Sequence, residues 1–170
     1  EAPFAPRKAG AREPGAAIRA LWDRFEGNQT VLMKKADGDV NRIRHEVYES
    51  CLRAAESPPG MFRLTVPTGG GKTRSGMAFA LQHALRHGQR RVIVVLPFIT
   101  ITQQTAKEYR GIFDRTEDVV TPVLEHHSGG NAVDADEHGD FHAGQVWARL
   151  AAENWDAPIV VTTTVQLFES

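Results

Sequence analysis

The sequence has few of the features that mark secreted, disulfide-stabilised or membrane-spanning proteins. Its 170 residues include a single cysteine, Cys51, so no disulfide can form within the chain, and a reducing, cytoplasmic location is expected. The most apolar stretch, Val92 to Ile101, is much shorter than the roughly 18 residues that a membrane-spanning helix requires, and Pro97 interrupts it. The formal net charge of −1 neither favours nor excludes a nucleic-acid partner, because a neutral protein can carry a basic groove.

Several catalytic motifs are also missing. The chain has no adjacent His-Asp pair to anchor a metal-dependent phosphohydrolase site, no G-x-S-x-G nucleophile elbow and no second cysteine. His126 and His127 are adjacent at the end of an expected strand, so their side chains point to opposite faces and do not easily share a metal ion. These absences leave little support for hydrolytic chemistry of those kinds.

One polar segment alternates acidic residues with histidine, a pattern that invites a metal-site interpretation. Measured against the spacing of a calcium loop, it places His138 where Asp or Asn is needed and Gln145 where a bidentate Glu is needed. We therefore interpret the segment as a solvated acidic loop, with Asp134, Asp136, His138, Asp140 and His142 as its members.

The chemistry that is present is concentrated in the run Val66-Pro67-Thr68-Gly69-Gly70-Gly71-Lys72-Thr73. Three successive glycines let the backbone wrap closely and direct several N–H groups toward one point. Lys72 adds a flexible cation that can reach β- and γ-phosphates, and Thr73 adds a hydroxyl for Mg²⁺ where a helix begins. The run predicts an ATP site with Mg²⁺, in which Lys72 and Thr73 are the catalytic candidates. The expected binding residues are Pro67, Thr68, Gly69, Gly70, Gly71, Lys72 and Thr73.

This run departs from the general phosphate-loop pattern at its first position. The pattern G-x-x-x-x-G-K-[ST] has a glycine where this chain has Val66, a position that helicase-like NTPases often relax. A dinucleotide fingerprint does not fit, because Arg74 stands where its third glycine is required. The alternative is a chance glycine-rich turn between a strand and a helix.

The remaining sequence alternates strand-like and helix-like segments, which is the pattern of βαβ units. It predicts an α/β fold with a parallel sheet flanked by helices and with the glycine-rich loop at the carboxyl ends of the strands. The run Val92–Leu96 is apolar and β-branched throughout, so we expect a strand buried on both faces. The expected helices cover residues 16–25, 41–55, 73–87, 100–113 and 142–155, and the expected strands cover 61–66, 92–96, 121–125 and 159–162.

The pattern also divides the chain into two parts. Residues 1–40 are expected to be a linker or tail with one short helix, because the first 15 residues are rich in Pro, Ala, Gly and Arg and lack periodicity. Residues 41–170 are expected to form the nucleotide-binding domain. Its first helix carries Cys51 on an apolar stripe, and either Asp39 or Asn41 is expected to cap that helix.

Four segments, taken in order, resemble the helicase part of the CRISPR-associated helicase–nuclease of type I systems, most closely the type I-C branch. They are LTVPTGGGKTRSGMAFALQHAL, RVIVVLPFITITQQTAKEYR, VLEHHS and ENWDAPIVVTTTVQLFES. The likeness covers about three quarters of the chain, and the last two segments are more specific to that family than the phosphate loop is. It implies a superfamily 2 helicase whose first RecA-like domain is represented here, with ATP, Mg²⁺, single-stranded DNA and a CRISPR surveillance complex as ligands and partners.

The resemblance also points to residues that contact DNA. The first group, Thr100, Gln103 and Gln104, offers neutral donors at a helix N-terminus, where backbone N–H groups also suit a phosphate. The alternative is that Thr100 caps that helix and that the glutamines are solvated. The second group, Thr163 and Thr164, lies at the end of the last strand, where the alternative is β-branched residues that finish the strand and cap the next helix.

Parts of the related enzyme are not found in this sequence. They are the His-Asp nuclease motif, the Asp-Glu-x-His segment that holds Mg²⁺, and the second RecA-like domain. The chain therefore reads as truncated before the Walker B strand, and we expect a weak nucleotide binder with little hydrolysis. Two alternatives stay open: another superfamily 2 motor, such as a restriction-type translocase, and a non-catalytic nucleotide-binding module.

Overall fold

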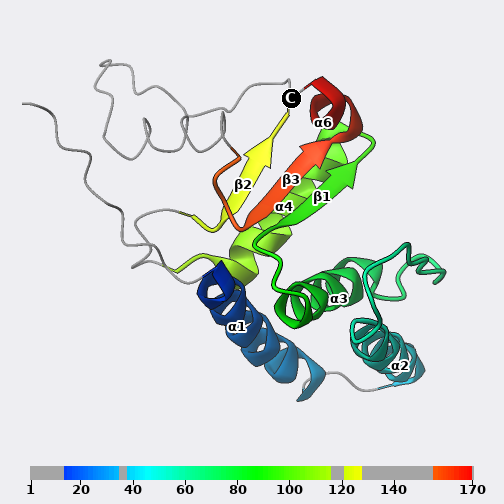
Figure 1. The fold of residues 1–170 in the computed structure, drawn as a ribbon. Coiled ribbons are helices and arrows are strands. Elements are labelled where there is room, and N and C mark those ends of the chain that lie inside the picture. Colours follow the sequence, from blue (N-terminus) through cyan, green and yellow to red (C-terminus); the bar gives the residue numbers. More distant parts are fainter. Residues whose placement is uncertain (1–13, 35–37, 116–120, 128–154, 170) are drawn as a thin grey trace, which may run out of the picture.

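The computed structural model describes residues 14–34, 38–115, 121–127 and 155–169. Five helices and three strands follow one another along these segments (Figure 1). In chain order they are α1 (Pro14–Lys34), α2 (Asp39–Ala54), α3 (Lys72–Arg86), β1 (Val92–Leu96), α4 (Ile99–Phe113), β2 (Val123–His126), β3 (Ile159–Thr163) and α6 (Thr164–Glu169). The helix predicted at residues 142–155 and the acidic loop at 134–142 lie outside the described residues, apart from Trp155.

The described strands form one parallel sheet in the order β1-β3-β2 (Figure 1). Every residue of β3 is buried, because a strand pairs with it on each side. The parallel α/β fold expected from the βαβ spacing is therefore confirmed. The register pairs Val92 and Val123 with Ile159, so the carboxyl ends of all three strands meet at one edge of the sheet.

The prediction that β1 is buried on both faces is wrong. Ile93 is 45% exposed and Val95 is 36% exposed, whereas Val92 is buried against the helices. Among the described strands β1 has a single neighbour, so the face that carries Ile93 and Val95 is covered less than the corresponding face of β3.

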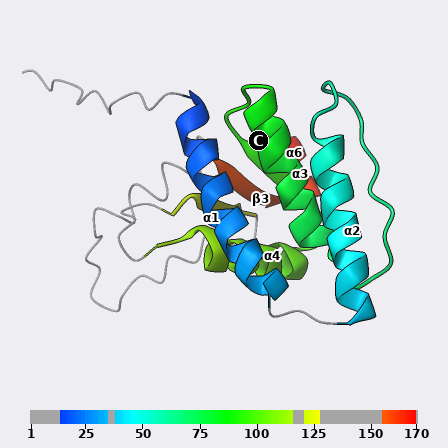
Figure 2. The same ribbon diagram turned by 90° about the horizontal axis from the view of Figure 1, so that it is seen from below.

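Helices α1, α2, α3 and α4 all contribute to the core beside the sheet. In Figure 2, α3 lies between α1 and α2, and α4 crosses near their ends. The largest fully buried side chains are Phe25 and Phe113, whose rings stack at 6.1 Å between α1 and α4, while Met77 and Leu81 fill the space from α3. Helix α1 thus shares its core with the elements that flank the phosphate loop.

Two of the predicted helices differ from the observed ones at their ends. Helix α1 continues to Lys34, well past the short helix predicted at residues 16–25, because Gln29 and its neighbours also contact α3. Helix α2 begins at Asp39 after Gly38, whose φ of +97° suits glycine, and no side chain caps it. The predicted cap by Asp39 or Asn41 is therefore wrong, while the predicted burial of Cys51 is confirmed.

The strand predicted at residues 61–66 is absent from the described sheet. Met61 is fully exposed, and the ring of Phe62 packs instead against Phe79 and His83 of α3, at 4.9 and 5.4 Å. Strand pairing depends on a partner that is remote in sequence, whereas this aromatic cluster offers nearby contacts. The chain that leads into the phosphate loop therefore follows α2 and α3 rather than the sheet.

None of the helices within the described ranges is long and apolar enough to cross a membrane.

Candidate nucleotide site

The glycine-rich loop has the conformation that its three glycines permit. Gly69 and Gly71 both have a φ of +83°, a region that residues with a Cβ rarely adopt. At Gly70 the restriction is contact rather than φ, since a Cβ there would lie 2.3 Å from Cγ1 of Val66 and 3.0 Å from the carbonyl oxygen of Pro67. The loop can therefore follow this path only without side chains at these three positions.

Lys72 and Thr73 begin α3 directly after the loop, and both side chains are exposed. The Nζ of Lys72 donates to the carbonyl oxygen of Val66 at 2.9 Å, so the ammonium group lies across the opening of the loop. The carbonyl oxygen of Thr73 accepts a long hydrogen bond of 3.4 Å from the hydroxyl of Tyr109 on α4. The two predicted catalytic candidates are therefore adjacent and accessible. Lys72 is held by its contact with Val66 and Thr73 by its contact with Tyr109.

The N-terminus of α3 is suited to an anion. Gly71 is its N-cap, no side chain of the described residues caps it, and the first intrahelical bond runs from Ser75 N to Gly71 O. The preceding N–H groups carry the positive end of the helix dipole and need acceptors. Together with Lys72 they form the donor set that a phosphate requires. The residues present therefore fit a nucleotide phosphate.

Arg44, on α2, is a site residue that the sequence did not reveal. Its Nε donates to the carbonyl oxygen of Gly69 at 3.0 Å, and its Cγ would lie 3.5 Å from a Cβ at Gly71. Its NH1 also donates to Oδ1 of Asn41 at 3.2 Å. The only signal in the sequence is the i, i+3 spacing of Asn41 and Arg44 on a polar face of α2.

An open cavity of about 410 Å³ lies beside Arg44, between the end of α1 and the start of α2. Leu32 and Met33 give it an apolar side. Its other lining residues are Gln29, Gly38, Asn41, Arg42, Arg44 and His45. Its volume lies in the range of small-molecule sites, and most of its lining residues are polar.

Arg74, the residue after Thr73, connects the start of α3 to α1. It is half-buried among α1, α3 and α4, with its guanidinium 5.4 Å from the ring centre of Phe25. Burial lowers the pKa of the Arg74 side chain from its ordinary value, and the charges of Glu108, Tyr48 and Tyr109 oppose that shift. Its hydrogen bonds to α1 connect the loop to the cavity.

The loop does not lie where the strand pattern predicted. No described strand leads into it, and its contact with the sheet layer is through Tyr109, in the second half of α4. Helix α4 begins at the carboxyl edge of the sheet and returns along it, so Tyr109 lies roughly 14 Å along the helix axis from Thr100. The phosphate loop and the carboxyl edge are therefore separate places in this structure, because residues 61–66 do not join the sheet.

The carboxyl edge carries the first group of predicted nucleic-acid contacts. Thr100, Gln103 and Gln104 are all exposed in the first two turns of α4. The N-cap of this helix is Phe98, so the alternative in which Thr100 caps the helix is wrong. Among the described residues no side chain caps this helix; within its first turn the hydroxyl of Thr102 donates to the carbonyl oxygen of Phe98 at 3.0 Å.

The second group, at the end of β3, is engaged within the protein. Oγ1 of Thr163 accepts from the backbone N–H of Gln166 at 3.2 Å, which is the helix-capping arrangement considered above. The hydroxyl of Thr164 donates to the carbonyl oxygen of Leu96 at 3.4 Å, so it connects α6 to the end of β1. Thr163 is buried and Thr164 is exposed.

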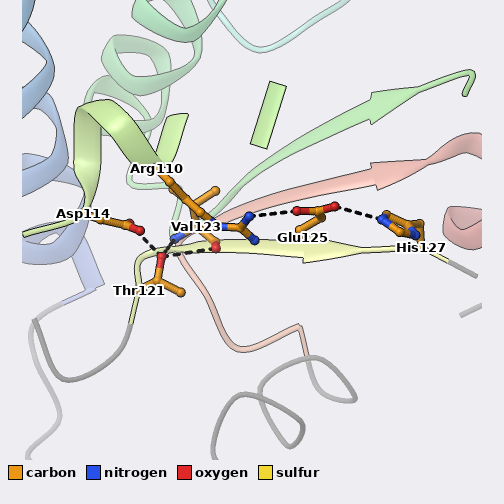
Figure 3. A network of polar contacts seen from close by, with 6 residues as sticks. All are labelled: Arg110, Asp114, Thr121, Val123, Glu125 and His127. Carbon is orange, nitrogen blue, oxygen red and sulfur yellow. Dashed lines mark hydrogen bonds and ion pairs between the residues drawn. The ribbon is translucent and has the colours of Figure 1, made fainter. Parts of the chain in front are cut away.

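A chain of polar contacts runs along β2 toward the same edge (Figure 3). NH1 of Arg110 lies 2.8 Å from one carboxylate oxygen of Glu125, and the other oxygen lies 2.8 Å from Nε2 of buried His127. Glu125 thus joins Arg110 of α4 to His127, the residue that follows β2. His127 and His126 point to opposite faces, as the strand alternation predicts.

On the other face, His126 is paired in register with Thr162. Nδ1 of His126 and Oγ1 of Thr162 are both buried without a hydrogen-bond partner among the described residues. Burial, assisted by His127, lowers the pKa of His126. Both effects favour the neutral form of His126.

Metal binding by protein side chains alone has no support in the part of the chain that the structure describes. It contains no group of three or more His, Cys, Asp or Glu side chains that could hold an ion. The exposed hydroxyl of Thr73 is in the position that the motif assigns to a ligand of nucleotide-bound Mg²⁺.

A glycine-rich loop that ends in Lys-Thr at a helix N-terminus, in an α/β protein with a parallel sheet, defines a P-loop nucleotide-binding protein of the RecA-like type. Residues 17–170 match the family model described as "Type III restriction enzyme, res subunit", so the chain belongs to this family of superfamily 2 helicase-like ATP-dependent motors. The searches of curated proteins and of solved structures gave no match.

Proposed function

We propose that this chain provides the ATP-binding part of a motor that moves on DNA during defence against foreign DNA. The observation that carries the proposal is the loop itself: two glycines at positive φ, a third without room for a Cβ, an uncapped helix N-terminus and the Lys72 ammonium at one point. Pro67–Thr73 hold the phosphates, and Mg²⁺ bound with ATP neutralises phosphate charge next to Thr73.

The residues of the loop bind and orient the phosphates. The ammonium of Lys72 exchanges the carbonyl oxygen of Val66 for a phosphate oxygen, since a charged acceptor forms the stronger hydrogen bond. Backbone N–H groups at the start of α3 bind the neighbouring oxygens. The hydroxyl of Tyr109 holds the loop at its end, Thr73, and the guanidinium of Arg44 holds it in the middle, at Gly69.

The nucleoside half of ATP is placed in the cavity between α1 and α2. This cavity adjoins Gly69 through Arg44, and its volume of about 410 Å³ accommodates a base and sugar. Its apolar side, formed by Leu32 and Met33, suits the flat face of a base.

Single-stranded DNA is placed at the carboxyl edge of the sheet. Thr100, Gln103 and Gln104 are exposed there and offer neutral donors to backbone phosphates. Thr163 and Thr164 have a different role in the proposal, because their hydroxyls are bonded to α6 and to β1. They shape the edge on which the DNA lies.

Two branches of defence motors fit these features. The segments VLEHHS and ENWDAPIVVTTTVQLFES favour the helicase–nuclease of type I CRISPR systems, recruited in the cytoplasm by a surveillance complex. The family match favours a restriction-type motor to the same degree. Loss of CRISPR interference against a plasmid in cells that carry Lys72→Ala in the gene supports the first branch, whereas loss of restriction alone supports the second.

The biochemical test measures binding and turnover separately. We expect the 170-residue chain to bind Mg-ATP but to hydrolyse it very slowly, with or without single-stranded DNA, because hydrolysis also needs groups that hold Mg²⁺ and activate water. Rapid steady turnover by the chain alone would contradict this division of roles, and the absence of any ATP binding would overturn the proposed function.

A further inference from the structure

Each wall of the cavity is hydrogen-bonded to the phosphate loop or to the residue that follows the loop. On the α2 side, Arg44 holds the carbonyl oxygen of Gly69. On the α1 side, Gln29 lines the cavity and accepts a hydrogen bond of 2.8 Å from Nε of Arg74, the residue after Thr73. Hydrogen bonds thus connect the phosphate loop to α2 on one side of the cavity and, through Arg74, to α1 on the other.

Arg74 makes a two-pronged contact with α1. While its Nε bonds Gln29, its NH2 donates to Oδ1 of Asn28 at 2.6 Å, and the guanidinium lies over the ring of Phe25. A planar guanidinium can hold two acceptors and stack at the same time, which a lysine ammonium cannot do. One side chain therefore fixes Phe25 and, about one helical turn further along α1, the neighbouring residues Asn28 and Gln29.

This contact also determines which end of the Gln29 amide remains available. A guanidinium only donates, so the oxygen of the amide must face Arg74, and its NH2 group is left on the other side. No described residue accepts a hydrogen bond from that NH2 group. On the α1 side, the cavity therefore presents the NH2 group of Gln29 as a donor to its ligand.

We infer that Arg74 is a positioning residue that aligns Gln29 to donate to the nucleoside half of the bound nucleotide. The inference rests on the proposed function, because it assumes that the loop binds the triphosphate. The acceptors that the nucleoside offers are ring nitrogens and sugar oxygens, and Gln29 binds one of them. Arg74 itself does not contact the ligand; it determines the geometry between the phosphate loop and the base-binding wall.

The test compares two ligands that share the phosphates but not the nucleoside. Affinities for Mg-ATP and for inorganic tripolyphosphate are measured by calorimetry on the 170-residue chain and its variants. For Gln29→Leu we expect the ATP affinity to fall about 3- to 10-fold, the range of one lost hydrogen bond, with tripolyphosphate affinity unchanged. Arg74→Met should give the same selective loss, and Arg74→Lys an intermediate one.

Matched controls are Gln82→Leu and Arg86→Met, which change the same residue types on the far side and far end of α3. Both should leave the two affinities as they are. Equal losses for ATP and tripolyphosphate in the Arg74 variants would overturn the inference, because a purely structural role disturbs the whole loop. Unchanged ATP affinity in Gln29→Leu would overturn it as well, even if the Arg74 variants fail to fold.

The proposed function fails in a different way. If Lys72→Ala leaves tripolyphosphate affinity unchanged, or if the unmodified chain binds neither ligand, the phosphate site itself is wrong. A selective effect of Gln29→Leu on ATP together with a tripolyphosphate affinity that depends on Lys72 supports both.

Discussion

The ammonium of Lys72 donates a 2.9 Å hydrogen bond to the carbonyl oxygen of Val66, the residue that occupies the first position of the loop motif. Both groups are accessible to water, so this contact adds little to stability. It keeps the cation at the mouth of the loop, where a phosphate can replace the carbonyl without a large movement of the chain.

Replacing Lys72 by alanine should therefore separate binding from folding. We expect Mg-ATP affinity to fall at least about tenfold, because a charge-assisted hydrogen bond to phosphate is lost. The free energy of unfolding should change by less than about 0.5 kcal/mol, as for other exposed side chains. Nucleotide titration and urea unfolding check the two parts, with the exposed Lys107→Ala on α4 as control. Retained affinity would refute the site assignment.

Gly70→Ala tests the close contact inside the loop. The added methyl group would lie 2.3 Å from Cγ1 of Val66, so the loop must open and nucleotide binding should be lost. The double variant Val66→Gly with Gly70→Ala removes the closer of the two contacts and leaves the carbonyl oxygen of Pro67 at 3.0 Å, so it should regain part of the affinity. As a control, Gly111→Ala on α4, where nothing lies within 4 Å, should stabilise the fold by about 0.5–1 kcal/mol. Failure of the double variant to recover would mean that another contact prevents binding.

The two glutamines on α4 test the proposed DNA edge. Replacing both Gln103 and Gln104 by alanine should weaken binding of single-stranded DNA several-fold. Since both side chains are neutral, the slope of log affinity against log salt should stay the same, unlike the loss of a lysine or arginine contact. Fluorescence anisotropy at several salt concentrations measures both quantities. Unchanged affinity would remove these residues from the interface, and Gln89→Ala is a matched control.

The two tyrosines of the chain should make the free energy of unfolding fall at alkaline pH. Burial, with help from Glu26 and Glu49, raises the pKa of Tyr48 to about 12, and burial beside Glu108 raises that of Tyr109. In the unfolded chain a phenol ionises near its ordinary pKa of 10.0, while the folded protein keeps the proton. Stability is therefore complete below pH 10 and should fall as the pH rises toward 12.

Absorbance of the phenolate follows this directly, because the sequence contains no other tyrosine. The folded chain should show little phenolate at pH 10, and its appearance should coincide with loss of helical circular dichroism. Tyr48→Phe should make unfolding by urea less dependent on pH in this range. Free ionisation of both tyrosines at pH 10 in a folded chain would contradict the packing described for α2 and α4.

The core between α1 and α4 should dominate stability. Phe113 is completely buried and stacks on Phe25 at 6.1 Å, so Phe113→Ala should lower the free energy of unfolding by about 3–5 kcal/mol. The control Phe168→Ala, 82% exposed, should change it by less than about 0.5 kcal/mol. Urea unfolding measures both, and a small effect of Phe113→Ala would mean that α1 does not pack on α4.

The sequence predicted the elements whose signals are local. The β-branched runs became β1 and β3, and the apolar periodicity of α3 and α4 gave their bounds to within a residue or so. The segment 61–66 was predicted incorrectly, since its strand-like composition says nothing about whether a partner strand is nearby, and Phe62 found contacts on α3 instead.

The site was predictable only in its loop. Three glycines, Lys72 and Thr73 have a fixed spacing that is diagnostic by itself. By contrast, Arg74 and Gln29 are 45 residues apart, and Arg44 and Gly69 are 25 apart, so their contacts depend on how α1 and α2 pack. Tertiary packing brings such residues together, and their spacing in the sequence does not predict these contacts.

The exposed side of β1 has a practical consequence for handling the protein. Ile93 and Val95 lie on a strand with one described neighbour, so its other edge offers unpaired backbone groups beside apolar side chains. Edges of this kind act as templates for further strands. Concentrated solutions of the 170-residue chain should therefore self-associate through β1. The substitution Ile93→Lys should keep such samples monodisperse.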